Sequence, residues 1–215
     1  MKARPLRDLV FVTHDARLVA ECAEVLKPAG ISVLSLTDMA LPEPGGVGAT
    51  ALHRASGKAS AVAWFSNLPA LGFAQEFCIR PLLRFRDDSG PQWTWLLSPS
   101  GPRGKIYAEI KKAHDELNRG GYCGPDDRGA FIRCVLCLTW PDMENLVLEA
   151  RIEGQLGDVG LRESGNAADV FSDYFVPDSE ERTIRSLSRP ARKRYSAFRR
   201  AIELLLDLKA PTHRD

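Results

Sequence analysis

The feature that most limits the possible folds is an uninterrupted apolar run, Leu9–Val12, followed at once by the polar turn Thr13–Asp15. Four bulky residues in a row are typical of a strand that is buried on both faces. Apolar residues then recur at helical spacing, and Thr13 or Asp15 can cap this helix at its start, while Gly30 can end it. The stripe consists of Val19, Cys22, Ala23 and Leu26. This strand-to-helix connection predicts an α/β protein. Its helix start suits a phosphate, although α/β domains without a phosphate ligand contain the same connection.

The rest of the chain alternates between predicted helices and strands, with turns rich in glycine and proline between them. Helices are predicted over residues 49–64, 105–119 and from Pro190 to about Leu208. Strands are predicted over Ile31–Leu36, Leu68–Leu71, Phe77–Phe85, its hairpin partner Trp93–Leu97, residues 130–139 and residues 146–153. No repeat and no long linker interrupts the pattern. We therefore expect a single α/β domain over residues 1–215 with a mixed sheet, and a disordered tail over residues 209–215.

Charge and cysteine usage narrow the classes of protein. A formal net charge of +1 provides no general argument for binding nucleic acid or a membrane surface. The apolar runs are too short to span a bilayer, and the N-terminus lacks the apolar segment of a signal peptide, so we expect a cytoplasmic location. Five scattered cysteines indicate reduced thiols. Cys134 and Cys137 form a CxxC pattern, but on a strand their side chains point to opposite faces, which argues against a metal or redox pair.

Eight short segments match one known family in both order and spacing. They are Val10–Asp15, Leu41–Pro44, Gly48–Thr50, Lys58-Ala59, Leu68–Leu71, Gly101–Tyr107, Phe175–Asp178 with Thr183, and Arg192–Ala201. Together they resemble the Ham1, or inosine triphosphate pyrophosphatase, family, which hydrolyses non-standard purine nucleoside triphosphates to monophosphates. The resemblance implies a mixed central sheet with flanking helices, a cleft between two lobes and a homodimer.

The sequence departs from the family's motifs at the positions that carry the family's chemistry. Asp15 stands in place of an Asn, and Leu18 in place of a Lys. Residues 73–76 read Phe-Ala-Gln-Glu where the family has Asp-Asp-Ser-Gly, so the Asp expected at position 74 is an alanine. In the base-recognition signature, residues 168–173, the aromatic Phe171 remains but the next residue is Ser172 instead of Asp. The family's Ser-His-Arg reads Ser196-Ala197-Phe198.

The residues that remain define the expected site. The resemblance assigns Glu43 to a metal ion and Lys58 to the substrate. The expected substrate-binding residues are Thr13, Asp15, Lys58, Phe171, Arg192, Lys193, Ser196 and Arg200, and no catalytic residue is assigned. Arginines dominate residues 182–200, and a single helix from Pro190 would place Arg192 and Arg199 on one side. That stretch is either a solvated helix face or an anion site. Glu43 alone makes a weak Mg²⁺ site, because such ions are held by more than one carboxylate when phosphates react.

Three functions follow from these residues. The main expectation is a divergent Ham1-like protein that binds a purine nucleotide or a related phosphate ligand, with weak or lost pyrophosphatase chemistry. The first alternative is an active pyrophosphatase with rebuilt metal ligands, and the second is an interaction or RNA-contacting protein that uses the basic C-terminal region, although net charge does not support RNA. Asp87-Asp88 is interpreted as part of a turn and His213 as part of the tail. Whether either replaces a lost site residue stays open.

Overall fold

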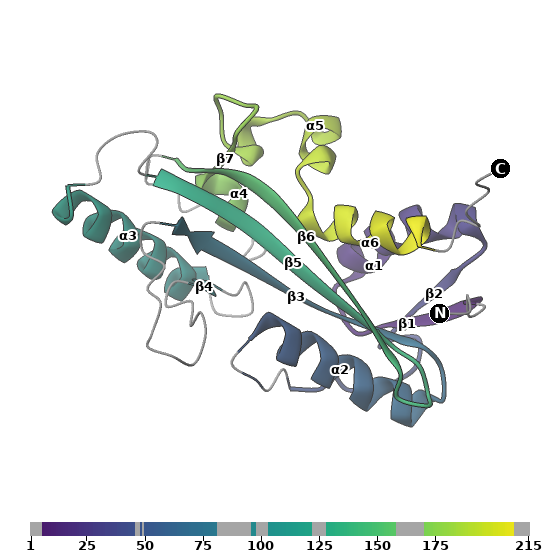
Figure 1. The fold of residues 1–215 in the computed structure, drawn as a ribbon. Helices are drawn as coiled ribbons and strands as arrows, with labels where there is room; N and C mark the ends of the chain where they lie inside the picture. Colours follow the sequence, from purple (N-terminus) through teal and green to yellow (C-terminus); the bar gives the residue numbers. More distant parts are fainter. Residues whose placement is uncertain are drawn as a thin grey trace. The chain divides into compact units, whose positions relative to one another are not determined.

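The computed structural model describes residues 6–45, 48, 50–80, 96–97, 103–121, 128–157 and 170–208. The longer elements (Figure 1) are β1 (Asp8–Phe11), α1 (Ala16–Leu26), β2 (Ser32–Ser35), α2 (Ala51–Ser66), β3 (Ala70–Ile79), α3 (Arg103–Arg119), β5 (Gly129–Thr139), β6 (Asn145–Leu156) and α6 (Ala197–Asp207). The shorter ones are η1 (Lys27–Ala29), β4 (Leu96–Leu97), α4 (Val170–Tyr174), β7 (Phe175–Pro177), η5 (Ile184–Ser186) and α5 (Arg189–Arg194).

The strands form one mixed sheet with the order β2-β1-β3-β5-β6-β7, and β4 also pairs with β3. β1 is parallel to both β2 and β3, whereas the β3–β4 and β6–β7 pairs are antiparallel. In β1, Leu9, Val10 and Phe11 are fully buried, as expected for a strand between two layers of helix. The mixed α/β architecture predicted from the sequence is confirmed.

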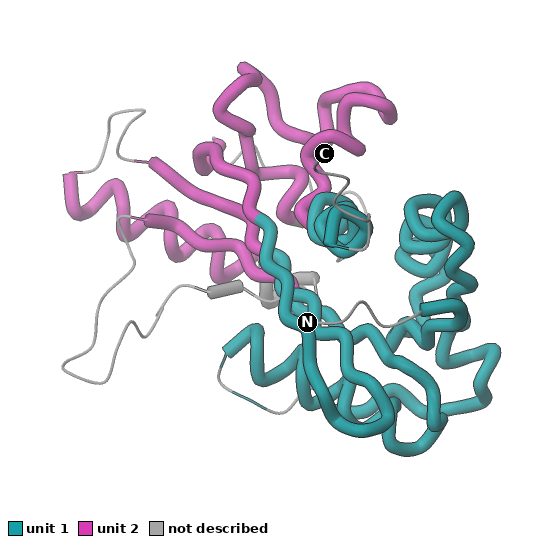
Figure 2. The backbone as a smooth tube through the Cα atoms, turned by 45° about the vertical axis from the view of Figure 1, so that its right-hand side comes forward, with its two compact units in different colours: residues 1–74, 134–150, 198–215 teal, residues 75–133, 151–197 magenta. Residues whose placement is uncertain are grey.

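The chain divides into two compact units (Figure 2). Unit 1 contains residues 1–74, 134–150 and 198–215, and unit 2 contains residues 75–133 and 151–197. Strands β3, β5 and β6 contribute residues to both units. The expectation of a single domain with a cleft between two lobes stays a prediction, and each unit is described by itself below.

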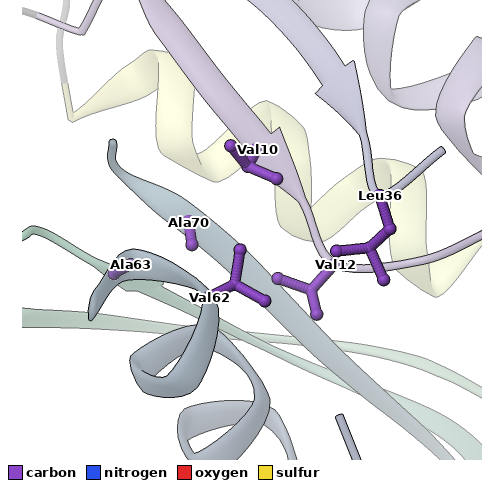
Figure 3. Close-up of a cluster of buried hydrophobic side chains, with 6 residues drawn as sticks. All are labelled: Val10, Val12, Leu36, Val62, Ala63 and Ala70. Atoms are coloured by element: carbon purple, nitrogen blue, oxygen red, sulfur yellow. The ribbon is translucent and has the colours of Figure 1, made fainter. Parts of the chain in front are cut away.

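In unit 1, α2 lies on one side of the strands, and α1 and α6 lie on the other (Figure 1). Small residues let α2 approach the sheet closely: a Cβ atom at Gly72 of β3 would lie 2.1 Å from the carbonyl oxygen of Ala55. Further along α2, Val62 and Ala63 pack on Val10 and Val12, next to Leu36 and Ala70 (Figure 3). On the opposite side, the Phe11 ring stacks on Phe198 of α6 at 5.3 Å.

In unit 2, an aromatic cluster forms the core. Phe77 of β3 stacks on Phe171 of α4, with ring centroids 5.3 Å apart, and meets Phe175 of β7 edge-on at 5.9 Å. β7 lies tightly against β6, since a Cβ atom at Gly154 would lie 2.2 Å from the carbonyl oxygen of Val176. Unit 2 therefore depends on aromatic packing on one face of β3.

Several local predictions are confirmed. Gly30 has the left-handed backbone (φ 73°) that ends the first helical segment, and residues 96–97 pair antiparallel with Phe77 and Cys78 as the predicted hairpin partner. Cys134 and Cys137 are both buried on β5. Cys137 packs with the alanines of α2. Burial, together with the negative charge of Glu21 on α1, raises the pKa of Cys134, so the two thiols face opposite sides of the sheet.

Two local predictions are wrong. The strands expected at Leu68–Leu71 and from Phe77 onward are not separate but form one strand, β3, from Ala70 to Ile79, because alternate residues of 72–77 pack against helices on both faces. Residues 81–85 of the second prediction lie outside the described residues. The helix expected from Pro190 to about Leu208 is two helices, with a break at Tyr195–Ser196. Tyr195 leaves the helical backbone (φ −104°, ψ 21°), and its hydroxyl donates to Glu180 Oε1 at 2.8 Å. The predicted turn at Asp87-Asp88 and the tail with His213 lie outside the described residues.

Candidate functional site

The start of the chain forms a binding geometry that is well known in α/β sheets. The chain leaves β1 for β2 on one side and later returns to β3 on the other side of β1. All three strands are parallel, so their carboxyl ends meet at a point where the connections diverge. Ligands of open α/β sheets bind at such a switch point. Thr13 and Asp15 follow β1 directly and therefore lie at this end of the strands.

Asp15 itself caps α1, although Thr13 was an equal candidate in the sequence. Its carboxylate accepts the backbone N–H of Arg17 at 2.9 Å, and the Arg17 guanidinium lies 3.2 Å from its other oxygen. The Thr13 hydroxyl accepts the backbone N–H of Asp15 at 3.1 Å. Burial alone would raise the pKa of Asp15, but the hydrogen bonds and charge of Arg17, with the Leu18 amide, lower it overall. The helix start thus already carries an ionised carboxylate where a phosphate would bind.

Lys58 and Glu43, the two residues that the resemblance assigns to substrate and metal, are in direct contact. The Lys58 ammonium donates to Glu43 Oε1 at 2.7 Å. Lys58 extends from α2 and its side chain is 17% exposed, whereas Glu43 lies in the preceding loop with a side chain 38% exposed. Among the residues that the structure describes, no three His, Cys, Asp or Glu side chains gather closely enough to hold a metal ion.

The positions of the missing acidic and basic residues are occupied by apolar packing. Phe73 and Phe198, which replace an expected Asp and an expected Arg, lie 5.5 Å apart between ring centroids, and both contact Phe11. Ala74 is 8% exposed and packs with Ala51, Ala55 and Ala59 of α2. An aspartate at position 74 would therefore enter an apolar layer between helix and sheet, where an unpaired charge is costly.

The expected site residues of unit 2 have a different environment. Phe171 is 3% exposed, and its ring stacks on Phe77, so a base can reach it only after that packing changes. Ser196 lies in the break between α5 and α6, and its backbone N–H donates to the carbonyl of Lys193 at 3.4 Å. The sequence showed an aromatic residue at position 171. It did not show that Phe77 buries this ring, because that contact depends on where α4 packs.

Several arginines of residues 182–200 are held by contacts within their own unit. Arg185 pairs with Asp173 at 3.2 Å, and Arg192 donates from Nε to the Leu187 carbonyl at 2.8 Å. In unit 1, Arg199 contacts Glu24 at 3.1 Å and Glu203 at 3.0 Å. Lys193 and Arg200 are exposed. Because the helix is broken at Tyr195, the spacing that was to place Arg192 and Arg199 on one side does not apply.

Sequence reasoning missed two groups of residues. The first is a pair of polar residues at the ends of β1 and β2, in which His14 Nδ1 lies 3.1 Å from the Thr37 hydroxyl. The position of these two residues just after predicted strands was the signal that could have found them. The second is a buried ion pair in unit 2, in which Arg133 of β5 lies 3.5 Å from the fully buried carboxylate of Glu76. No sequence pattern indicated that pair, since it depends on the neighbouring positions of β3 and β5.

Comparisons with known proteins agree with this architecture. The model of the Ham1 family matches residues 9–208. A dITP/XTP pyrophosphatase of Gluconobacter oxydans is 29% identical over 206 residues, covering 96% of this chain and 92% of the relative. A dITP/XTP pyrophosphatase of Bradyrhizobium sp. is 30% identical over 176 residues, which cover 82% of this chain and 78% of the relative.

The fold agrees as well. The structure of a HAM1 protein from Coxiella burnetii superposes with a TM-score of 0.72 at 20% identity, covering 94% of this chain and 98% of the other. No described helix has the length and hydropathy needed to cross a bilayer. With a family model matched over almost its whole length and relatives that cover most of it, this chain belongs to the Ham1 family.

Proposed function

We propose that this protein is a purine nucleoside triphosphate pyrophosphatase that acts on the class of substrate named for its relatives, dITP and XTP, and releases a nucleoside monophosphate and pyrophosphate. The observation that carries the proposal is identity of about 30% with dITP/XTP pyrophosphatases over most of both chains. The sheet switch point beside Thr13 and the cation of Lys58 support a phosphate ligand in unit 1.

The family's metal ion needs separate consideration. Glu43 is a single carboxylate that already holds an ammonium group, and Ala74 provides no second one. The described residues therefore do not fit an Mg²⁺ site of the expected kind, and no step of the reaction is assigned to a metal held by them. Rebuilt ligands remain part of the proposal, with Asp87 and Asp88, outside the described residues, as the candidates that the sequence offers.

Nucleotide binding with weak or absent turnover is the second candidate. The contact between Phe73 and Phe198 favours it, because two positions expected to carry charge now form an apolar cluster with Phe11. Losing two groups that stabilise a transition state electrostatically removes about four orders of magnitude in rate, if each contributes about 3 kcal/mol. The homodimer, which the resemblance implies, and the cytoplasmic location, which the sequence analysis expects, stay predictions.

Pyrophosphate release and nucleotide binding distinguish the candidates. Purified protein is assayed on dITP, XTP and ATP with Mg²⁺ or Mn²⁺, and binding of the same nucleotides is measured by calorimetry. A kcat above about 1 s⁻¹ on dITP or XTP, with a monophosphate product and at least tenfold preference over ATP, supports the pyrophosphatase. Binding without turnover supports the second candidate. If neither binding nor turnover is detected, both candidates are contradicted and the interaction protein is favoured.

A matched pair of lysine variants tests whether the activity or binding belongs to the proposed site. Lys58→Gln should lose nucleotide affinity, whereas Lys27→Gln, at an exposed lysine of η1 in the same unit, should not. Equal effects of the two substitutions would show that the measured binding is nonspecific attraction to positive charge.

A further inference from the structure

The contact between Glu43 and Lys58 determines which cation Glu43 can bind. The distance from the Lys58 ammonium to Glu43 Oε1, 2.7 Å, is that of a short charge-assisted hydrogen bond. An ammonium group at this distance offsets the charge of the carboxylate and competes with a divalent ion for the same oxygen. Lys58 is more deeply buried than Glu43, which favours retention of the pair over exchange with water.

The surroundings of the pair offer no second carboxylate. For an ion that bridges phosphates, the resemblance implies a second carboxylate beside Glu43, an Asp at position 74. The nearest sequence candidate, position 74, is an alanine packed on α2, the helix that also carries Lys58. Position 74 lies two residues beyond the close contact of α2 with Gly72, in a cluster of alanines, so a carboxylate introduced there would enter an apolar layer. Glu43 therefore faces one fixed cation and lacks the partners of a metal ligand among the described residues.

We propose that Glu43 in this chain holds the Lys58 ammonium instead of a divalent metal ion, and so positions the cation that the proposed function assigns to a phosphate. Glu43 is then a positioning residue for Lys58. The part that concerns phosphate rests on the proposed function, whereas the part that concerns metal does not. The consequence is that Glu43 contributes nothing to any dependence of triphosphate affinity on divalent cations.

The metal part is tested with Mn²⁺ alone. Binding of Mn²⁺ to the full chain is followed by electron paramagnetic resonance for the wild type, Glu43→Gln and the control Glu181→Gln, an exposed glutamate in unit 2. We expect the wild type and both variants to give the same titration. A site for one Mn²⁺ per chain, with Kd below about 1 mM, that disappears in Glu43→Gln and persists in Glu181→Gln would overturn the proposal.

The phosphate part is tested with inosine triphosphate by calorimetry, in EDTA and in Mg²⁺. The ratio of the Kd values in EDTA and in Mg²⁺ should agree within about threefold between the wild type and Glu43→Gln. Lys58→Gln should raise Kd about tenfold or more in both, as expected for a lost charged hydrogen bond, and Lys58→Arg should restore most of the affinity. Thermal unfolding of each variant shows whether the fold is retained.

The possible results separate the two proposals. Binding that is at least tenfold tighter in Mg²⁺ than in EDTA, with that difference lost in Glu43→Gln, would overturn the inference while leaving the proposed function intact. Absence of inosine triphosphate binding in every condition would contradict the proposed function and the role of Lys58, and the Mn²⁺ titration would still decide what Glu43 holds.

Discussion

At the scale of single residues, Asp15 changes what the start of α1 can bind. The expected Asn would cap the same N–H without a charge and leave the helix dipole to attract an anion, whereas the Asp15 carboxylate brings its own negative charge. The side chain is still a good N-cap, so the residue contributes to helix stability at the expense of anion affinity.

Asp15→Asn separates these two effects. Asn caps a helix about as well as Asp, so the free energy of unfolding near pH 7 should change by less than about 1 kcal/mol. Removing the charge should tighten binding of inosine triphosphate about two- to fivefold at low salt, the size of a helix-terminus charge effect. Calorimetry is the measurement, and Asp8→Asn, at an exposed position at the start of β1, is the control. Unchanged or weaker binding in Asp15→Asn would contradict a phosphate at this helix start.

The lowered pKa of Asp15 predicts a pH dependence of stability. Because the folded-state pKa lies below the ordinary value of 3.8, the unfolded chain takes up the proton first as pH falls. The stabilisation from ionised Asp15 is therefore present above about pH 4 and disappears as pH falls through the folded-state pKa. Urea unfolding of the wild type and Asp15→Asn between pH 3 and 6 should show a wild-type advantage that declines toward pH 3. An advantage that stays constant over this range would contradict the prediction.

At the scale of elements, the packing of α2 on β3 occupies positions where the family's acidic motif was expected. Helix and strand meet through alanines and Gly72, and the strand continues without a loop through the positions where Asp-Asp-Ser-Gly was expected. The double substitution Ala74→Asp and Leu18→Lys would raise activity only if the rest of the site were intact. An Asp at position 74 instead enters the layer between α2 and the sheet, and we expect it to destabilise unit 1.

Gly72→Ala measures how tightly α2 and β3 fit. The added Cβ atom would lie 2.1 Å from the Ala55 carbonyl oxygen and 3.0 Å from the Ala59 nitrogen, so backbone must move. We expect a loss of about 2 kcal/mol or more in the free energy of unfolding, typical of overpacking. Gly45→Ala is the matched control, because a Cβ atom there meets nothing within 4 Å. Denaturant unfolding curves that are equal for the two variants would show that α2 is less tightly packed than described.

At the scale of the whole molecule, the fold of the family persists although polar residues of its site have changed. A TM-score of 0.72 at 20% identity shows that the arrangement of strands and helices tolerates extensive substitution. Apolar positions with the right volume and spacing are sufficient for such packing, whereas a catalytic site requires particular groups at particular places. Family membership therefore determines the architecture more strongly than it determines the reaction.

Thiol labelling tests the packing of both units in one experiment. Cys22, Cys134 and Cys137 in unit 1 and Cys78 in unit 2 are buried. Burial raises the pKa of Cys22 to about 12 and also raises the pKa values of Cys134 and Cys137, which disfavours the reactive thiolate. At pH 8 these four thiols should react with a disulfide reagent only as fast as the protein opens. All five cysteines should react at once in denaturant, and rapid native labelling of any of the four would contradict the described packing.

The sequence by itself determined the local structure and the family. The run Leu9–Val12, a helix start within Thr13–Asp15 and the turn at Gly30 are local properties of a few neighbouring residues, and they agree with the structure. The order and spacing of short segments were sufficient to identify the Ham1 family, because segment order is retained when single residues change.

Only the tertiary structure decided how distant residues meet. The pairing of Glu43 with Lys58, the contact between the Phe73 and Phe198 rings and the burial of Phe171 each join side chains that are far apart in the sequence or depend on where a helix packs. The break at Tyr195 has the same origin, since its hydroxyl bonds to Glu180 fifteen residues earlier. Periodicity reports which face of one element is apolar, but it contains no information on the partner that covers that face.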